Sequence, residues 1–144
     1  MKILYTDEMN CGLTYEFFTK IAESVFNELD MQDNQYEISL LLTDDEIIRQ
    51  LNKEYRNKDK STDVLSFPME DDIMLGDIAI SVDTAKRQAE EAEINFDRET
   101  AFLFIHGLLH LLGYDHETSQ EDEAEMFALQ EKILKKLIDY GTVS

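Results

Sequence analysis

The chain has 144 residues, of which 43% are hydrophobic. This length and composition suffice for one compact domain over residues 1–144, and the chain is too short for two ordinary domains. Its single cysteine, Cys11, excludes an internal disulfide, and its first residues lack the apolar core of a secretory signal, so a cytoplasmic location is expected. The net charge of −19 argues against diffuse attraction to nucleic acid or an anionic membrane, and no apolar segment reaches the roughly 20 residues of a membrane span.

Strand and helix patterns alternate in the first half of the chain. Residues 2–5 and 36–42 are predicted strands. Between them, apolar residues recur at every fourth position and predict an amphipathic helix: Leu13, Phe17, Ile21, Val25 and Leu29.

A second helix is predicted to begin near Thr43 and to run to about residue 55. Thr43 and Glu46 have the spacing at which a hydroxyl and a carboxylate cap a helix start reciprocally. The polar residues 57–61 then predict a loop. The apolar face of this helix is expected to carry four residues: Ile47, Ile48, Leu51 and Tyr55.

Two short strands follow the loop. The first, over residues 62–68, should end at Pro68, which has no N–H for further strand pairing. The second covers residues 76–81, and Ser81 is a candidate cap for the helix after it.

Helical patterns fill the rest of the chain. Residues 97–112 are apolar around most of the helix circumference, as expected for a central buried helix. Thr118 and Glu121 form a second candidate capping pair before the last helix. The residues of that helix predicted to face inward are Phe127, Ile133, Leu134 and Leu137. The sum is an α+β fold, in which a small mixed β-sheet is covered by helices.

Basic residues gather in one short segment, although the chain as a whole is acidic. Five of the thirteen lie within a dozen positions: Arg49, Lys53, Arg56, Lys58 and Lys60. This cluster is a candidate anion site. The alternative is a solvated helix face and loop whose cations balance nearby acids.

The segment HGLLHLLGYDH holds every histidine of the chain. His106 and His110 are four positions apart on the predicted buried helix, so their side chains project side by side. Gly113 can end the helix in a left-handed conformation, and the turn after it would return His116 toward the other two.

Three imidazoles leave one open position on a tetrahedral zinc ion, as in catalytic sites. The cation lowers the pKa of a water bound at that position to about 7. We therefore predict one zinc ion held by the three histidines, with nickel or another transition metal able to substitute. The alternative is that they are ordinary core histidines, which requires three independent coincidences of spacing.

The histidine spacing also matches an elongated metalloprotease signature, except at one position. Where those proteases carry a glutamate base, this chain has Gly107. Peptide hydrolysis without its general base loses a factor of about 10² to 10⁴ in rate, so a protease is the weaker interpretation.

Three segments in combination resemble the YbeY endoribonuclease family, also called rRNA maturation factor. They are YRNKDKSTDVLSFP at 55–68, LGDIAIS at 75–81 and HGLLHLLGYDH at 106–116. The resemblance implies a metal-dependent endoribonuclease acting on single-stranded ribosomal RNA, in maturation of the small-subunit rRNA 3′ end and in ribosome quality control. It implies the small ribosomal subunit as a partner, no DNA substrate, and His106, His110 and His116 as zinc ligands.

Arg56 stands where the family has a functionally important arginine, and a guanidinium can grip phosphate through two parallel hydrogen bonds. Taken without the family, Arg56 would be read as a surface salt-bridge residue. Asp115 could act as a base, orient an imidazole or simply form a turn. Two other functions stay open: a non-enzymatic ribosome-assembly factor with a structural metal, and a metalloprotease-like hydrolase.

Overall fold

The computed structural model describes residues 1–32, 35–114 and 119–144. Its strands form a four-stranded sheet in the order β1-β2-β4-β3. They are β1 (Lys2–Asp7), β2 (Glu37–Thr43), β3 (Val64–Pro68) and β4 (Met74–Ser81). Strand β2 runs parallel to both β1 and β4, whereas β3 pairs antiparallel with β4 at the edge. The predicted mixed sheet is confirmed.

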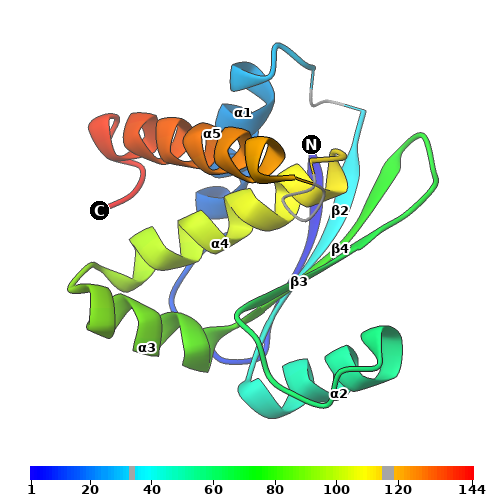
Figure 1. Cartoon of the computed structure of the whole chain (residues 1–144). Coiled ribbons are helices and arrows are strands. Elements are labelled where there is room, and N and C mark those ends of the chain that lie inside the picture. The colour runs from blue at the N-terminus through cyan, green and yellow to red at the C-terminus, as the bar shows by residue number, and fades with distance from the viewer. Residues whose placement is uncertain (33–34, 115–118) are drawn as a thin grey trace.

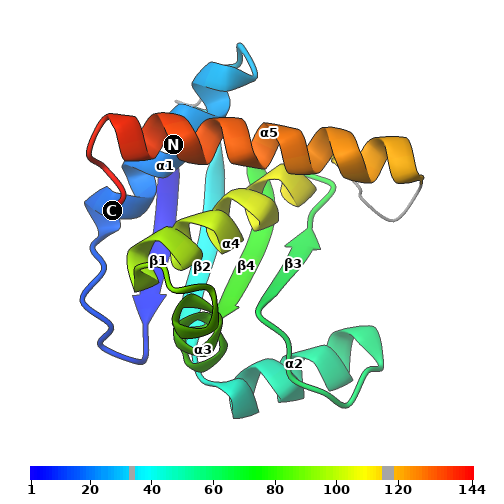
Figure 2. The same ribbon diagram turned by 60° about the vertical axis from the view of Figure 1, so that its left-hand side comes forward.

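The described helices are α1 (Tyr15–Glu28), α2 (Asp45–Arg56), α3 (Val82–Ala92), α4 (Phe96–Leu111) and α5 (Gln120–Asp139). Helix α4 packs on β3 and β4 and contacts α1 and α3, while α5 lies over α4 and α1 (Figure 1). Figure 2 shows α4 running diagonally across the sheet, with α5 above it in this view. None of the described helices combines the length and the apolar character that a bilayer crossing requires.

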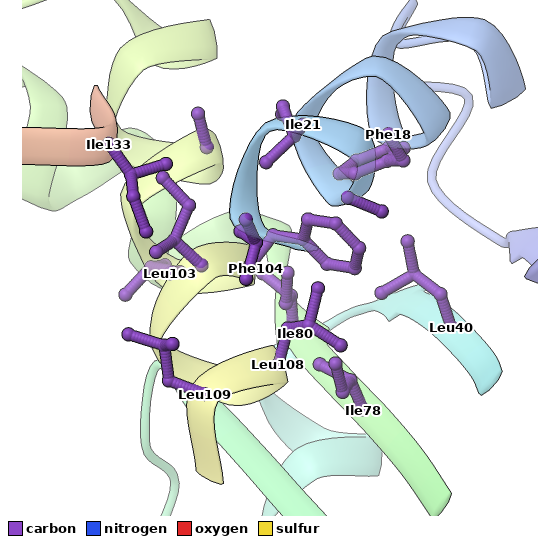
Figure 3. Close-up of a cluster of buried hydrophobic side chains, with 14 of the residues drawn as sticks. Phe18, Ile21, Leu40, Ile78, Ile80, Leu103, Phe104, Leu108, Leu109 and Ile133 are labelled. Atoms are coloured by element: carbon purple, nitrogen blue, oxygen red, sulfur yellow. The ribbon is translucent and has the colours of Figure 1, made fainter. Parts of the chain in front are cut away.

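The main core lies between the sheet and helices α1, α4 and α5. Phe104 of α4 is fully buried at its centre and meets the ring of Phe18 edge-on, with 5.1 Å between the centroids. Leu40, Ile80 and Ile133 converge on the same helix from β2, β4 and α5 (Figure 3). Helix α4 is therefore enclosed on most sides, which explains its apolar circumference and confirms its predicted central position.

A smaller cluster on the other face of the sheet holds α2. Side chains alternate along a strand, so Ile78 faces the main core while Ala79 faces the opposite way. Ala79 packs there with Ile48 of α2 and Leu65 of β3. This packing fixes α2 against the edge of the sheet and so determines where its last residue, Arg56, lies.

Two glycines let α4 approach the sheet closely. A Cβ atom on Gly107 of α4 would lie 3.0 Å from Cγ2 of Ile78. A Cβ on Gly76 of β4 would collide with the Phe67 carbonyl oxygen and lie 2.9 Å from Leu111 of α4. Gly76 also has a φ of +143°, which residues with side chains rarely adopt. The histidine-bearing half of α4 rests on β3 and β4 because these positions carry no side chain.

Two helix caps differ from the predicted ones. Helix α2 is capped by Asp44, whose carboxylate accepts an amide hydrogen bond, and the predicted cap Thr43 belongs to β2 instead. Helix α5 is capped by Ser119, whereas the predicted cap Thr118 lies outside the described residues. Aspartate and serine cap helices as well as threonine does. Residue type alone therefore does not decide which of several neighbouring candidates becomes the cap.

Two aromatic side chains predicted to face inward are exposed. Phe127 of α5 is 55% exposed and packs only its ring edge toward Phe102. Tyr55 of α2 is 65% exposed and lies edge-on to Phe67. Both follow the apolar period of their helices, but the element beneath each is a single helix or an edge strand, which is too narrow to cover a whole ring.

One carboxylate joins α2 to α3 and to the segment before β3. Asp45 Oδ1 accepts hydrogen bonds from Ser81 at 2.5 Å, Thr84 at 2.6 Å and Ser61 at 3.2 Å. Its Oδ2 pairs with Arg87 at 3.0 Å. Burial raises the pKa of Asp45, but the hydroxyl donors and Arg87 outweigh that effect and lower its pKa to about 2.

Replacing Gly76 with alanine should lower the free energy of unfolding by about 3 kcal/mol or more, because the added Cβ meets backbone at an unfavourable φ. Gly141→Ala is the matched control: its φ is +80°, but open space surrounds it, so a loss of about 1 kcal/mol is expected. Chemical denaturation measures both. Equal losses would show that the contact between α4 and the sheet tolerates an extra atom.

Asp45→Asn should lose about 2 kcal/mol of stability near pH 6, where the charge-assisted hydrogen bonds of wild type are intact. A carboxylate whose folded pKa is depressed stabilises the fold above its unfolded value of 3.8, and this contribution disappears as the pH falls toward 2. The difference in unfolding free energy between variant and wild type should therefore decrease as the pH falls from 4 to 2. Denaturation curves across this range test the claim, with the exposed Asp72→Asn as control. A gap that does not change with pH would contradict it.

Candidate functional site

Helix α4 carries His106 and His110 one turn apart. Their rings are half-buried, with 4.6 Å between centroids and an interplanar angle of 60°. The turn predicted at Gly113 is present, with a φ of +101°. The Gly113 amide donates to the His110 carbonyl and the Tyr114 amide to the Leu109 carbonyl, both at 3.0 Å, as in a Schellman cap. The helix therefore ends directly after its second histidine.

These two histidines fit part of a metal site. Imidazoles one helical turn apart are a common way to direct two nitrogens at one cation. His116 and Asp115 lie outside the described residues, and within residues 1–32, 35–114 and 119–144 no three potential ligands come together. The described chain supplies two of the three predicted ligands, and the complete set stays a prediction.

Both histidines line a cleft of about 820 Å³ between α4, β3 and the end of α2. Arg56, the last residue of α2, lines the same cleft. Lys58 and Lys60 line it from the loop that follows. The structure thus brings the predicted arginine together with the two predicted imidazoles, although they are far apart in the sequence.

Strand β3 forms one wall of this cleft. Ser66 and Phe67 both line it, and the Ser66 hydroxyl donates to the Gly107 carbonyl of α4 at 3.4 Å. Asp63, just before the strand, accepts a hydrogen bond from the Val64 amide at 2.7 Å. The wall is therefore fixed both to the helix that carries the histidines and to its own entering loop.

Two side chains of α2 hold the loop of residues 57–61 in place. Arg49 donates from Nε to Asp59 Oδ1 at 2.7 Å and from Nη2 to Oδ2 at 3.3 Å. This arginine lowers the pKa of the Asp59 carboxyl through hydrogen bonding and charge. Asn52, only 2% exposed, donates from Nδ2 to the Lys60 carbonyl at 2.9 Å. The position of Lys60 at the cleft follows from this second contact.

The basic cluster divides into two groups. Arg49 is paired with Asp59, and neither it nor Lys53 lines the cleft. Arg56, Lys58 and Lys60 are exposed, line the cleft and form no ion pair with any residue in the described part of the chain. The solvated-face interpretation therefore suits Arg49, whereas the other three have the geometry of an anion site.

Gly107 has a packing reason to be glycine. Any Cβ there would lie 3.0 Å from Ile78 Cγ2 and 3.3 Å from the Ser66 hydroxyl oxygen. A glutamate at this position would require the Ile78 and Ser66 side chains to shift by a few tenths of an ångström. The close approach of the helix to the sheet therefore favours glycine where the protease signature has its base.

Several lining residues escaped the sequence prediction, among them Asn52 and Tyr114. A signal for Asn52 existed, because it stands four positions after the buried Ile48 on a face that is otherwise apolar. A buried polar residue in such a place usually has a specific hydrogen-bonding task. Tyr114 follows the helix-ending glycine, and no periodicity marks it.

Comparisons with known proteins identify relatives of this chain. A sequence model of the family described as Endoribonuclease YbeY matches residues 6–138. Proteins named Endoribonuclease YbeY from Sulfurihydrogenibium sp. and Nautilia profundicola are 51% and 54% identical to this chain, over 87% and 85% of it and 84% and 85% of their own lengths. The protein of that name from Persephonella marina is 42% identical over 96% of this chain and 94% of its own.

A solved structure shows the same fold. The solution structure of TM1509 from Thermotoga maritima superposes with a TM-score of 0.67 at 26% sequence identity, covering 98% of this chain and 91% of that one. The family match covers β2, β3, β4 and the last two residues of β1, together with the five described helices except the last residue of α5. The chain belongs to the YbeY endoribonuclease family.

Proposed function

We propose that this protein is a metal-dependent endoribonuclease that cleaves single-stranded ribosomal RNA. The observation that carries the proposal is one cleft in which two imidazoles, one helical turn apart, meet three cations that no described carboxylate pairs with. The relatives named Endoribonuclease YbeY support it, because they match this chain over most of its length. RNA phosphates would supply the negatively charged partners that these cations do not have within the described residues.

Arg56 is the residue we assign to the scissile phosphate. A guanidinium can bind two phosphate oxygens at once and stabilise the charge that develops on them during cleavage. Lys58 and Lys60, which line the same cleft, would bind neighbouring phosphates as point charges. The remaining surface of this chain of net charge −19 would repel RNA that does not enter the cleft.

His106, His110 and His116 would hold one zinc ion, for which nickel or another transition metal could substitute. When bound, such an ion supplies Lewis-acid character at the phosphoryl oxygen and lowers the pKa of a coordinated water. Both described histidines line the cleft that Arg56 lines, so the reacting phosphate would lie between the arginine and the imidazoles. Asp115 could orient an imidazole or accept a proton, and a turn role stays open for it.

The biological setting follows from the family. We propose that the substrate is the 3′ end of the small-subunit rRNA, and that the protein also serves ribosome quality control in the cytoplasm with the small subunit as its partner. No DNA substrate is proposed. A protease is disfavoured because glycine stands at position 107 in place of the glutamate base, and a Cβ there would press against Ile78 and Ser66.

Arg56→Ala should reduce kcat/KM for a single-stranded rRNA fragment by about 10² or more, and Arg56→Lys should recover only part of the loss because lysine binds phosphate without the bidentate geometry. Binding should also depend less on salt, with a slope of log K against log salt that is smaller by about 0.7 for each cation removed. Lys53→Ala, on the same helix but outside the cleft lining, is the matched control. If all three variants behaved alike, Arg56 would have no special role.

Dialysed wild-type protein should retain about one zinc ion and cleave single-stranded rRNA but not casein, with cleavage abolished by a chelator and restored by zinc. His110→Ala should lose the metal and the cleavage while keeping its circular dichroism spectrum, because the His110 side chain is only half-buried. Chelator-resistant cleavage would refute the metal proposal, and casein hydrolysis would favour the protease. Ribosome binding without any cleavage would favour the assembly-factor alternative.

A further inference from the structure

Gln130 of α5 contacts one of the candidate metal ligands from outside the cleft. Its side chain is 3% exposed, and its Oε1 lies 3.4 Å from Nδ1 of His106, which is 24 positions away on α4. Gln130 does not line the cleft itself. The contact therefore reaches the imidazole from the side opposite to the one where RNA and metal would bind.

Packing alone does not explain a glutamine at this position. The other buried residues of α5, which is described throughout, are all apolar: Met126, Ile133, Leu134 and Leu137. Gln130 Nε2 is buried and has no hydrogen-bond partner within the described residues. An amide buried with one group unsatisfied costs free energy that a methionine of similar length would avoid. The polar side chain must contribute something other than stability.

The geometry of an imidazole ring shows what that contribution is. The two ring nitrogens lie on different edges, so an Nδ1 that faces Gln130 on α5 leaves Nε2 directed away from α5, toward the cleft that His106 lines. A carbonyl oxygen can only accept, so a hydrogen bond in this contact requires the proton on Nδ1 and puts the lone pair of the neutral ring on Nε2. That is the tautomer a ligand bound through Nε2 must have.

We propose that Gln130 is a positioning residue that sets the tautomer and ring orientation of His106 for metal binding, an inference that rests on the metal site proposed above.

Ion pairs with α1 hold the helix that carries Gln130, α5, in place. Glu28 of α1 binds Lys132 at 2.6 Å and also pairs with Lys136, and both lysines lower the pKa of the Glu28 carboxyl through hydrogen bonds and charge. Gln130 thus approaches His106 from a helix already fixed to α1.

The test compares Gln130→Met, which removes the acceptor, with Gln130→Glu, which keeps an oxygen at the same distance along the side chain. Gln50→Met, at an exposed position of α2 outside the cleft lining, is the matched control. Three quantities are measured for each protein: the zinc Kd by competition with a chromophoric chelator, the unfolding free energy of the metal-free form by denaturation, and the His106 tautomer by nitrogen-15 NMR at pH 8.

Gln130→Met should weaken zinc binding by about 10- to 100-fold, as is typical when the partner of a ligating histidine is removed. Its metal-free stability should not fall, because the unsatisfied amide is gone, and the Nδ1–H tautomer of His106 should lose its dominance. Gln130→Glu should bind zinc nearly as wild type does, and Gln50→Met should not differ from wild type.

Wild-type zinc affinity and an unchanged tautomer in Gln130→Met would overturn the inference while leaving the metal site intact. A parallel loss of stability and affinity that Gln130→Glu does not rescue would assign Gln130 to packing and overturn it as well. Failure of wild type itself to bind zinc would instead overturn the proposed metal site, and the inference with it.

Discussion

The contact of α4 with the sheet is the constraint on which the rest of the structure depends. At Gly107 the helix backbone lies so near Ile78 that an added Cβ would come within 3.0 Å of its Cγ2, and a Cβ on Gly76 would come within 2.9 Å of Leu111. The histidines therefore project from a helix that is enclosed by the core on its other sides. A ligand pair on such a rigid element keeps its geometry without help from the metal, which a loop would not ensure. The same close packing means that any side chain at position 107 would press on Ile78 and Ser66.

Charge is distributed by the same architecture. Several basic side chains are paired with acids in the described structure, as Arg49 is with Asp59 and Arg87 with Asp45. Arg56 stands at the end of α2, beyond the reach of those pairs, and lines the cleft instead. An acidic protein can in this way present a local positive surface, because only interactions within about one Debye length decide what enters the cleft.

The spacing of apolar residues predicted the strands and the central helix, and the conformational freedom of glycine predicted the turn at Gly113. These features depend on residues that are neighbours in the sequence. Exposure of Phe127 could not be predicted, since it depends on how wide the covering element is. The shared cleft of Arg56 and the histidines was reached only through family resemblance; no local pattern says that two distant segments meet. Gln130 gave no signal at all, because an isolated glutamine in an amphipathic helix is usually a surface residue.

The cleft has walls that come from widely separated parts of the chain. Ser66, which lines it, and Gly107, whose carbonyl accepts from the Ser66 hydroxyl, are 41 positions apart, and both depend on β4 having paired with β2 and β3. Such non-local contacts form only once the loops between them have closed. A chain emerging from the ribosome thus has no cleft until α4 has been synthesised and has docked on the sheet. The chain can therefore bind RNA in the cleft only when the fold is complete, and an incompletely synthesised chain cannot.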